Sequence, residues 1–451
     1  MTLTRTRTLV LAFALLAALV IAVRADAPHV YAITGARLVT SAGAPIDAGT
    51  IVIRGGFIDA IGAAVAVPPE AVVTDGKGMI VYPGLIDLGN SAGVVVPALE
   101  APRDARTLME FERVRRQTLL RANVEAAQYL RSDAPELRRL AGSGITTVLA
   151  TPPGEVLPGR SSLVNVVAPE EGPQIGNVAD ERRGLYVVRT PVALHVTFTP
   201  GGGREATYPA SGLGAIAFVR QALLDAGHYQ LELARYERLK ASEPRPVFDA
   251  ALEALQPALA AKIPVVFRAG SAVEIRAALS IAKEFGLDPI IAGAQQGDQA
   301  VTELKAQKAR VIYSLNYPVR SRALAPGADE PLSVLRARAN APKVPAALEA
   351  GGLVYGFSSA GLADPKEFLR NAARAVRAGL APDAALRALT INAATIAGAA
   401  DRLGSLERGK IANVLVASGD LFDDRTRIIH VFVDGRPVPL EADRPAAPRP
   451  R

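Results

Sequence analysis

The sequence predicts an α/β protein in which a (β/α)8 TIM barrel is inserted into a small β-sandwich domain formed by both ends of the chain. Short alternating strands broken by Gly and Asp turns fill residues 30–81, and a similar β pattern returns near the C-terminus. Between them, Ala-, Leu- and Arg-rich helical stretches alternate with short apolar strands, the pattern of parallel βαβ units. A chain of 451 residues with 49% hydrophobic residues can form one large domain and a smaller one.

The N-terminus has the features of a secretory signal peptide, predicted over residues 1–25. Arg5 and Arg7 precede an apolar run from Leu9 to Val23, and a small-residue cleavage site follows at Ala25. The run is short for a membrane anchor, which needs roughly 20 residues. We therefore expect cleavage, no remaining membrane attachment, and a periplasmic or secreted location.

The composition excludes several classes of function. The formal net charge of +7 falls by three when the leader is removed, because its only charged residues are three arginines. No cluster of basic residues interleaved with aromatics remains, so nucleic acid is not an expected partner. The chain has no cysteine, which excludes disulfides, thiolate catalysis and cysteine-ligated metals.

The composite β-sandwich domain is expected over residues 26–82 and 402–440. Its N-terminal strands are predicted from YAITGARLVT, GTIVIRGGFIDAIG and AVVTDGKGMIVYPG. Its C-terminal strands are predicted from GSLERGKIANVLVAS and TRIIHVFVDGRPV. The Pro-rich tail at 441–451 is predicted to be disordered.

The barrel is expected over residues 83–401, with about eight strands separated by helices. After PGLID, the apolar strand segments are GITTVLATP, SLVNVV, VALHVTF, IPVVFRAG, DPIIAGA, ARVIYSL and LVYGFSSAG. A helical pair, PKEFLRNAARAVRAGL and PDAALRALTINAATIAG, completes this region before the β pattern returns.

Several stretches resemble the amidohydrolase superfamily of cyclic amidases and imidazolonepropionase-like enzymes. They are GARLVT, GTIVIRGGFIDAIG and GMIVYPGLIDLGNS near the N-terminus, and ALRALTINAATIAGAADRLGSLERGKIANVLVAS and VFVDGRPV near the C-terminus. The chain is most similar to exported imidazolonepropionase-like members, which carry the block YPASGLGAIAFVRQALLDAGHY, here Tyr208–Tyr229. Within this block, Arg220 and Asp225 are interpreted as structural charges of a docked helix in preference to substrate contacts.

The resemblance implies hydrolysis of carbon–nitrogen bonds by one or two divalent metals, normally zinc, at the C-terminal mouth of the barrel. Such a metal lowers the pKa of bound water and polarises the carbonyl, while an Asp accepts the proton. The family's ligands are a His-x-His pair after the first strand, often a carboxylated Lys after the fourth, His after the fifth and sixth, and Asp after the eighth.

The corresponding positions of this chain hold poor metal ligands. The His-x-His positions follow Asp87, which corresponds to the Asp of the family's PGLID motif. The other ligand positions lie in IPVVFRAG, DPIIAGA and LVYGFSSAG. In chain order these positions are Gly89, Ser91, Arg268, Gly293 and Ser358. Arginine offers only donors and a positive charge, so Arg268 would repel a cation.

Few other residues can supply ligands. The chain has four histidines, at His29, His195, His228 and His430. Only His195, in VALHVTF, lies on an expected barrel strand, where a core or mouth residue is the favoured interpretation over a ligand. No lysine lies between Lys77 and Lys240, and the latter is in a charged helical stretch, so no carboxylated lysine is expected. We predict no metal and no other cofactor.

Two other chemistries have weak support. Ser91, Ser358 and Ser359 lie near the mouth, but GFSSAG is not a Gly-x-Ser-x-Gly elbow and shows no adjacent base. The glycine-rich PGGGRE at Pro200–Glu205 lacks the Gly-Lys-Ser/Thr ending of a phosphate loop.

The leading hypothesis is therefore a pseudoenzyme, an exported amidohydrolase-fold protein without metal that acts as a binding protein or as a partner subunit of an intact amidohydrolase paralogue. The alternative is an active hydrolase of cyclic amide or other carbon–nitrogen bonds, with a reduced site around His195, Asp87 and Asp364. The sequence leaves the substrate and homo-oligomerisation open.

Five residues are candidates for a ligand pocket, namely Asp87, His195, Arg268, Ser358 and Ser359. The charge of Arg268 favours a small ligand that is anionic or carbonyl-rich, such as an amide. The competing interpretation is an ion pair between Arg268 and Asp87 or another local carboxylate.

Overall fold

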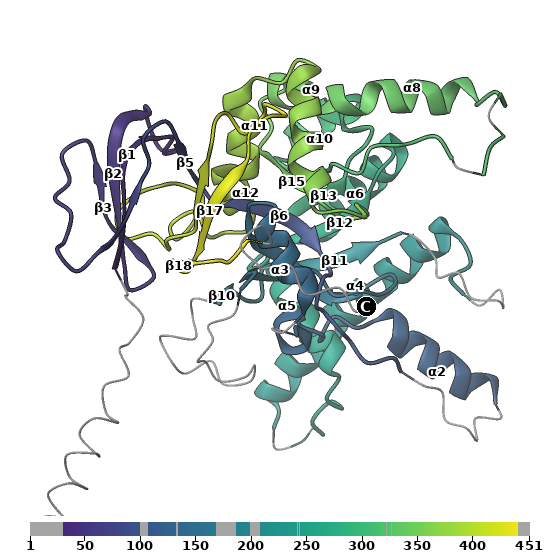
Figure 1. Ribbon diagram of the computed structural model, residues 1–451. Helices are drawn as coiled ribbons and strands as arrows, with labels where there is room; N and C mark the ends of the chain where they lie inside the picture. The colour runs from purple at the N-terminus through teal and green to yellow at the C-terminus, as the bar shows by residue number, and fades with distance from the viewer. Residues whose placement is uncertain are drawn as a thin grey trace, which may run out of the picture.

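The computed structural model shows two regions side by side, a β-rich one and a larger one of strands and helices (Figure 1). The described residues are 30–99, 107–131, 134–167, 186–198, 208–240, 242, 244–321, 323–325 and 327–440. The predicted signal peptide, His29, the loop at Pro200–Glu205 and the tail at 441–451 lie outside them. Within the described ranges, no helix is long and apolar enough to cross a membrane.

Both ends of the chain join in one sheet. Its N-terminal strands are β1 (Val30–Leu38), β2 (Ile46–Arg54), β3 (Phe57–Gly62), β4 (Val72–Asp75) and β5 (Ile80–Pro83). Its C-terminal strands are β16 (Val414–Ala417), β17 (Ile428–Val433) and β18 (Arg436–Pro437). The order is β18-β17-β16-β5-β1-β2-β3, with β4 also paired to β1. Because Tyr82 in β5 lies opposite Leu415 in β16, backbone hydrogen bonds hold the two chain ends together.

This region is one curled sheet, where the sequence predicted a sandwich. Ile53 of β2 shares a buried cluster with Val414 of β16 and Phe432 of β17, although these strands are far apart in the sheet order. The backbone N–H of Ile58 in β3 donates to the carbonyl of Lys410, just before β16, at 2.9 Å. The sheet thus folds over and covers its own apolar face. In a β-sandwich, a separate second sheet covers that face.

The second region is mixed α/β and contains two further sheets. The first has the order β10-β9-β7-β6, with β6 at Leu85–Asn90, β7 at Ile145–Ala150, β9 at Ser162–Asn165 and β10 at Val187–Arg189. The second has the order β15-β14-β13-β12-β11-β8, with β8 at Gly159–Arg160, β11 at Leu194–Thr197, β12 at Val265–Ala269, β13 at Pro289–Gly293, β14 at Arg310–Ser314 and β15 at Tyr355–Ser358. β11 to β15 are consecutive and parallel, as the βαβ pattern predicted.

One of the predicted βα units is wrong. The segment SLVNVV forms β9, which runs antiparallel to β7 with Leu163 opposite Leu149. No helix lies between Ala150 and Ser162, a stretch that is fully described. A parallel return needs a crossover of about a dozen residues or more, usually helical, whereas a shorter connection reverses the chain.

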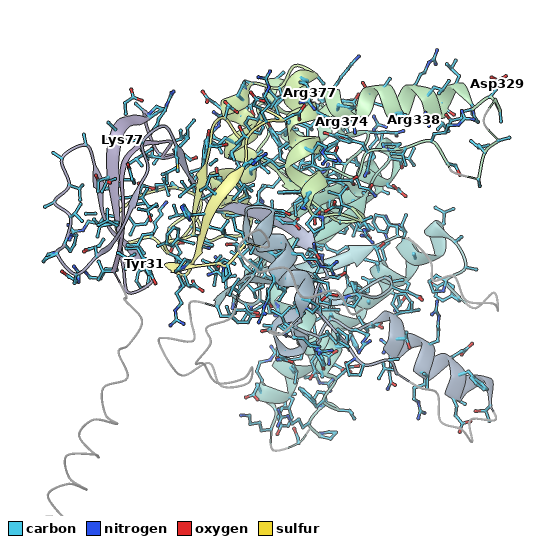
Figure 2. All side chains as sticks on the ribbon, viewed as in Figure 1. Tyr31, Lys77, Asp329, Arg338, Arg374 and Arg377 are labelled. Carbon is cyan, nitrogen blue, oxygen red and sulfur yellow. The ribbon has the colours of Figure 1, made fainter. Side chains whose placement is uncertain are left out.

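The helices of this region pack on the strands or extend from them (Figure 1). They are α2 (Leu108–Leu119), α3 (Pro135–Gly142), α4 (Gly212–Arg238), α5 (Ala250–Leu259), α6 (Ala272–Phe285), α7 (Val301–Ala306), α8 (Leu332–Asn340), α9 (Val344–Ala350), α10 (Lys366–Arg377), α11 (Pro382–Leu389) and α12 (Ile391–Ile396). After β12, Ser271 and Glu274 form a capping box that starts α6. Arg374 of α10, labelled in Figure 2, stacks over Tyr317, with the guanidinium carbon 5.0 Å from the ring centroid.

Alternate strand residues face two different apolar cores. Val265 and Phe267 of β12 pack in a cluster with helix residues such as Leu279 of α6. Val266, between them, packs in a second cluster that we call the inner core. The strand residues of the inner core are Ile86, Leu88, Leu149, Leu163, Val188, Val266, Ile290 and Ile312. Because they come from both sheets, the two sheets face a common interior.

The block Tyr208–Tyr229 forms most of the buried part of α4. Its Arg220 pairs with Glu284 of α6 at 2.8 Å, and its Asp225 accepts a hydrogen bond from Arg116 of α2 at 2.9 Å. Both charges therefore connect α4 to neighbouring helices, as the structural interpretation expects.

Candidate functional site

The ends of β6 and β15 are joined by side-chain hydrogen bonds. The bonds run between the segment Asp87–Asn90 and the pair Ser358 and Ser359. Both strands contribute their carboxyl ends here, the edge at which parallel α/β folds place their chemistry. The structure thus brings four of the candidate residues together, namely Asp87, Gly89, Ser358 and Ser359.

Gly89 and Ser358, two of the vacated ligand positions, are in direct contact. Ser358 Oγ donates to the carbonyl oxygen of Gly89 at 3.0 Å and accepts from the backbone N–H of Ala360 at 3.0 Å. A Cβ atom on Gly89 would lie 2.8 Å from Ser358 Oγ, which is closer than real Cβ contacts. The space that an imidazole would need at Gly89 is therefore filled by the serine.

Asp87 is fully buried, and donors surround its carboxylate. Its Oδ1 accepts from the backbone N–H groups of Ser359 at 2.8 Å and Gly89 at 3.2 Å. Its Oδ2 accepts from the hydroxyl of Ser359 at 2.5 Å and from Asn90 Nδ2 at 3.3 Å. Burial raises the pKa of Asp87 to about 6, and the hydrogen bonds from Ser359, Asn90 and Gly89 oppose this rise.

Asn90 is a member of this cluster that the sequence did not identify. Its Nδ2 bridges Asp87 and the hydroxyl of Ser359, at 2.9 Å from the latter, while its Oδ1 accepts from the backbone N–H of Ala92 at 2.6 Å. The available signal was its place between Gly89 and Ser91, because a strand that alternates faces can turn this residue toward a neighbouring strand end. Ser91 itself is exposed.

Arg268 lies near the end of β12 with its side chain exposed. It makes no ion pair with any residue that the structure describes, and the oxygens of Asp87 are bonded by Ser359, Asn90 and Gly89. The competing interpretation of Arg268, an ion pair with Asp87, is therefore wrong.

His195, on β11, is 8% exposed. Its Nε2 is buried and has no hydrogen-bond partner among the described residues. Burial, with a smaller contribution from the charge of Arg268, lowers the pKa of His195 to about 3. The imidazole is therefore neutral near pH 7, in a position that leaves one of its nitrogens without a partner.

The remaining candidates lie outside the hydrogen-bonded cluster around Asp87. Gly293, at the end of β13, has a φ of 99°, a conformation that glycine adopts most readily. Asp364 is exposed, and its Oδ1 accepts from the backbone N–H of Lys366 at the start of α10. His228 lies on the exposed side of α4, next to Glu232 at 3.2 Å, and His430 lies in β17.

The residues at or next to these strand ends do not fit the metal centre that the family resemblance implies. Because the chain has no cysteine, zinc would need imidazole or carboxylate ligands here, with usually four ligands in all. The five corresponding positions hold Gly, Ser or Arg. In the part of the chain that the structure describes, no group of three or more His, Asp or Glu residues is arranged to hold a metal ion.

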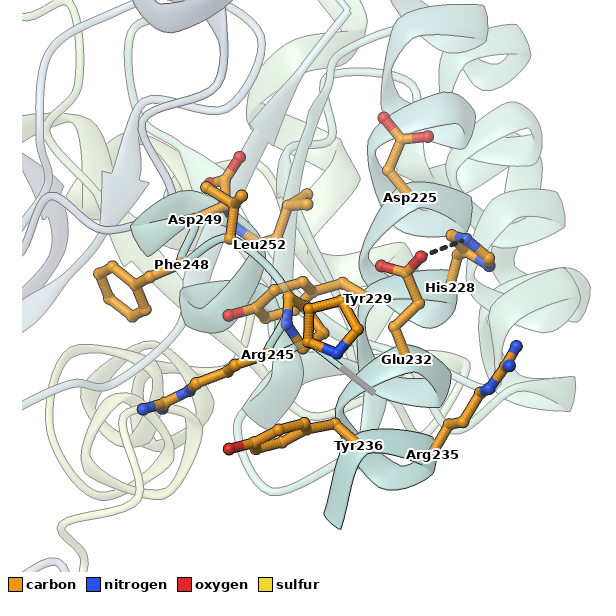
Figure 3. A pocket seen from close by; sticks show the side chains of 13 residues that line it. Asp225, His228, Tyr229, Glu232, Arg235, Tyr236, Arg245, Phe248, Asp249 and Leu252 are labelled. Carbon is orange, nitrogen blue, oxygen red and sulfur yellow. Dashed lines mark hydrogen bonds and ion pairs between the residues drawn. The ribbon is translucent and has the colours of Figure 1, made fainter. Parts of the chain in front are cut away.

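A groove of about 790 Å³ lies elsewhere, between the C-terminal half of α4 and residues 244–252. Tyr229, Tyr236 and Phe248 line it, and Figure 3 shows His228 paired with Glu232 at its side. None of the candidate site residues contributes to its wall.

Comparison with known proteins supports the family. A model described as "Amidohydrolase family" matches residues 298–438. An amidohydrolase from Thermotoga maritima superposes with a TM-score of 0.72 at 22% identity, over 90% of this chain and 99% of that chain. A prolidase complexed with N-methylphosphonate-L-proline gives a TM-score of 0.53 at 18% identity, over 91% and 99% of the two chains. Molinate hydrolase gives 0.50 at 18% identity, over 94% and 99%.

No relative among curated protein sequences matches the chain. The structural matches below 25% identity establish the fold, and the matched family model covers β14, β15 and the C-terminal strands that complete the composite sheet. The sequence motifs, the fold and the family model agree: residues 298–438 match the amidohydrolase family, and 90% of the chain has the fold of a solved amidohydrolase.

Proposed function

We propose that this chain is a pseudoenzyme, a member of the superfamily that has lost metal-dependent hydrolysis and acts as a binding protein or as a partner subunit of an intact amidohydrolase paralogue. Hydrolysis of carbon–nitrogen bonds is the activity that its family suggests. The contact between Gly89 and Ser358 is the observation that carries the proposal, because Ser358 fills the space that a ligand side chain at position 89 would need.

Several features of the mouth support the loss of catalysis. A metal hydrolase needs a cation that lowers the pKa of water and an acceptor for the proton. Arg268 places a fixed positive charge where the family has a histidine ligand. Ser358 replaces the proton acceptor, and Asp87, the remaining carboxylate, is enclosed by donors and inaccessible.

The proposal includes the architecture and location expected from the sequence. We propose that the two sheets of the second region close into one barrel over residues 83–401, supported by their common inner core and by the bonds between β6 and β15. An exported, periplasmic or secreted location is supported by the leader sequence, and N-terminal sequencing of the mature protein tests it.

Elemental analysis of the purified chain tests the loss of the metal centre. The protein is dialysed against zinc, manganese or nickel, freed of excess metal and analysed beside a metal-bearing amidohydrolase treated identically. We expect far less than one metal ion per chain. A stoichiometric metal that is retained would overturn the proposal and favour the alternative, an active hydrolase with a reduced site.

A further inference from the structure

Arg268 and His195 face the same interior from adjacent strands. In the parallel pairing of β11 with β12, Thr197 lies opposite Arg268 and His195 lies opposite Val266. Leu194, Val196, Val265 and Phe267 all pack toward the helices, in the cluster outside the strands. Since side chains alternate along a strand, His195, Thr197 and Arg268 point to the side of Val266, which belongs to the inner core.

Arg268 brings a positive charge to this interior that no described carboxylate neutralises. Both carboxylate oxygens of Asp87 already accept hydrogen bonds, from Ser359, Asn90 and Gly89. Glu274, which follows β12, accepts hydrogen bonds at its Oε2 from the backbone N–H groups of Gly270 and Ser271 at the start of α6. A guanidinium offers a planar fork of donors that matches a carboxylate with two parallel hydrogen bonds.

His195 provides a second, independent indication of a ligand. It is more than nine-tenths buried, and its Nε2 lacks a partner among the described residues. A buried polar atom without a hydrogen bond costs about 1–3 kcal/mol, so such atoms are rare unless a ligand or an ordered water completes them. As a neutral imidazole, the side chain can donate to or accept from a polar atom that enters from the mouth.

We propose that Arg268 and His195 form a binding site for a small organic acid, with the carboxylate paired to the guanidinium and a second polar atom of the ligand hydrogen-bonded to Nε2 of His195. This site rests on the proposed function in one respect, since it requires that no metal cation lies beside Arg268. Such a ligand would neutralise the charge of Arg268 and would also give Nε2 of His195 a hydrogen-bond partner.

Titration calorimetry with acetate, succinate and N-acetylglycine, at constant ionic strength, tests this site. N-acetylglycine carries a carboxylate and an amide, so we expect it to bind more tightly than acetate. Arg268→Gln should weaken its binding about tenfold or more, as expected for a charge-assisted bond. Arg268→Lys, which keeps the charge and loses the fork, should give an intermediate loss, and His195→Leu a smaller loss than Arg268→Gln.

Arg370→Gln is the matched control, because Arg370 is exposed on α10 and is not a candidate residue. Its affinity for N-acetylglycine should equal that of the wild type, and circular dichroism confirms that each variant is folded. Equal affinities for the wild type and Arg268→Gln, no binding of any of the acids, or a preference for inorganic phosphate would each overturn the carboxylate site.

The metal content of the same samples separates this inference from the proposed function. Metal-free protein whose binding does not depend on Arg268 overturns the carboxylate site alone. Stoichiometric metal in the wild type overturns the proposed function, whatever the acids do.

Discussion

The contact between Gly89 and Ser358 predicts a specific pattern of stabilities. Gly89→Ala should destabilise the protein by about 1–3 kcal/mol, because the new Cβ would lie 2.8 Å from Ser358 Oγ. Ser358→Ala should cost about 1 kcal/mol through the lost hydrogen bonds. The double variant should be less destabilised than the sum, because the alanine at 358 removes the colliding oxygen.

Urea unfolding of the four proteins measures this coupling. Gly227→Ala is the control, since nothing lies within 4 Å of a Cβ at this position in α4. Alanine is the better helix former, so this variant should be unchanged or more stable by up to about 1 kcal/mol. If the losses of stability from Gly89→Ala and Ser358→Ala were strictly additive, the predicted collision between a Cβ at position 89 and Ser358 Oγ would be contradicted.

A buried polar network connects β7 and β9 to the composite sheet. Asn165 of β9 donates to Asp434 at 2.5 Å, and Asn413 Nδ2 donates to Thr147 of β7 at 2.9 Å and to Asn165 Oδ1 at 2.8 Å. The backbone N–H of Asp434 donates to Asn413 Oδ1 at 2.9 Å. Polar groups that are buried together in this way fix the relative position of the elements that carry them.

Asp434 should make the stability of this junction depend on pH. Burial raises its pKa to about 8, so the folded state keeps a proton that the unfolded state releases near pH 4. The contribution of Asp434 to stability should therefore be greatest below about pH 4 and should fall as the pH rises from about 4 to 8, with a slope of up to about 1.4 kcal/mol per pH unit. Asp434→Asn, which removes the titrating group and suits the φ of 51°, should flatten this slope.

Chemical unfolding at several pH values between 6 and 8 measures the difference between Asp434→Asn and the wild type. Asp87, with its pKa near 6, contributes mainly below this range. Asp401→Asn, an exposed substitution beside the same sheet, should keep the wild-type slope. Identical slopes for Asp434→Asn and the wild type would refute the role of this carboxyl group.

Which elements form was largely predictable, whereas their direction and partners were less so. The apolar runs predicted the strands β6, β7 and β11 to β15, because burial and periodicity are properties of a local segment. The antiparallel direction of β9 depends on a connection that the apolar pattern does not describe. Asn90 and Asn165 bond to partners more than 200 residues away in the chain. The place of Asn90 between two expected ligand positions was a local signal for it, whereas no local pattern indicated Asn165.

The composite sheet and the second region share buried surface, although the sequence divides them into domains. Leu415 of β16 belongs to the same core cluster as Ile145 of β7 and Leu140 of α3. A Cβ on Gly144 would lie 3.0 Å from Ile428 Cδ1 and 3.3 Å from Leu415 Cδ1, which shows how closely β16 and β17 approach the start of β7. A core continuous across two regions favours unfolding as one cooperative unit.

We therefore expect one calorimetric unfolding transition for the purified chain, and Leu415→Ala should move this whole transition. Loss of a buried leucine side chain costs about 2–5 kcal/mol, and the cost should appear in both regions because Leu415 packs between them. Far-ultraviolet circular dichroism and calorimetry should report the same midpoint for the wild type and for the variant. Leu231→Ala, at a site 69% exposed on α4, should change stability by less than about 0.5 kcal/mol. If Leu415→Ala split the transition in two, the composite sheet would be an independently folding domain attached to the rest only by its chain connections.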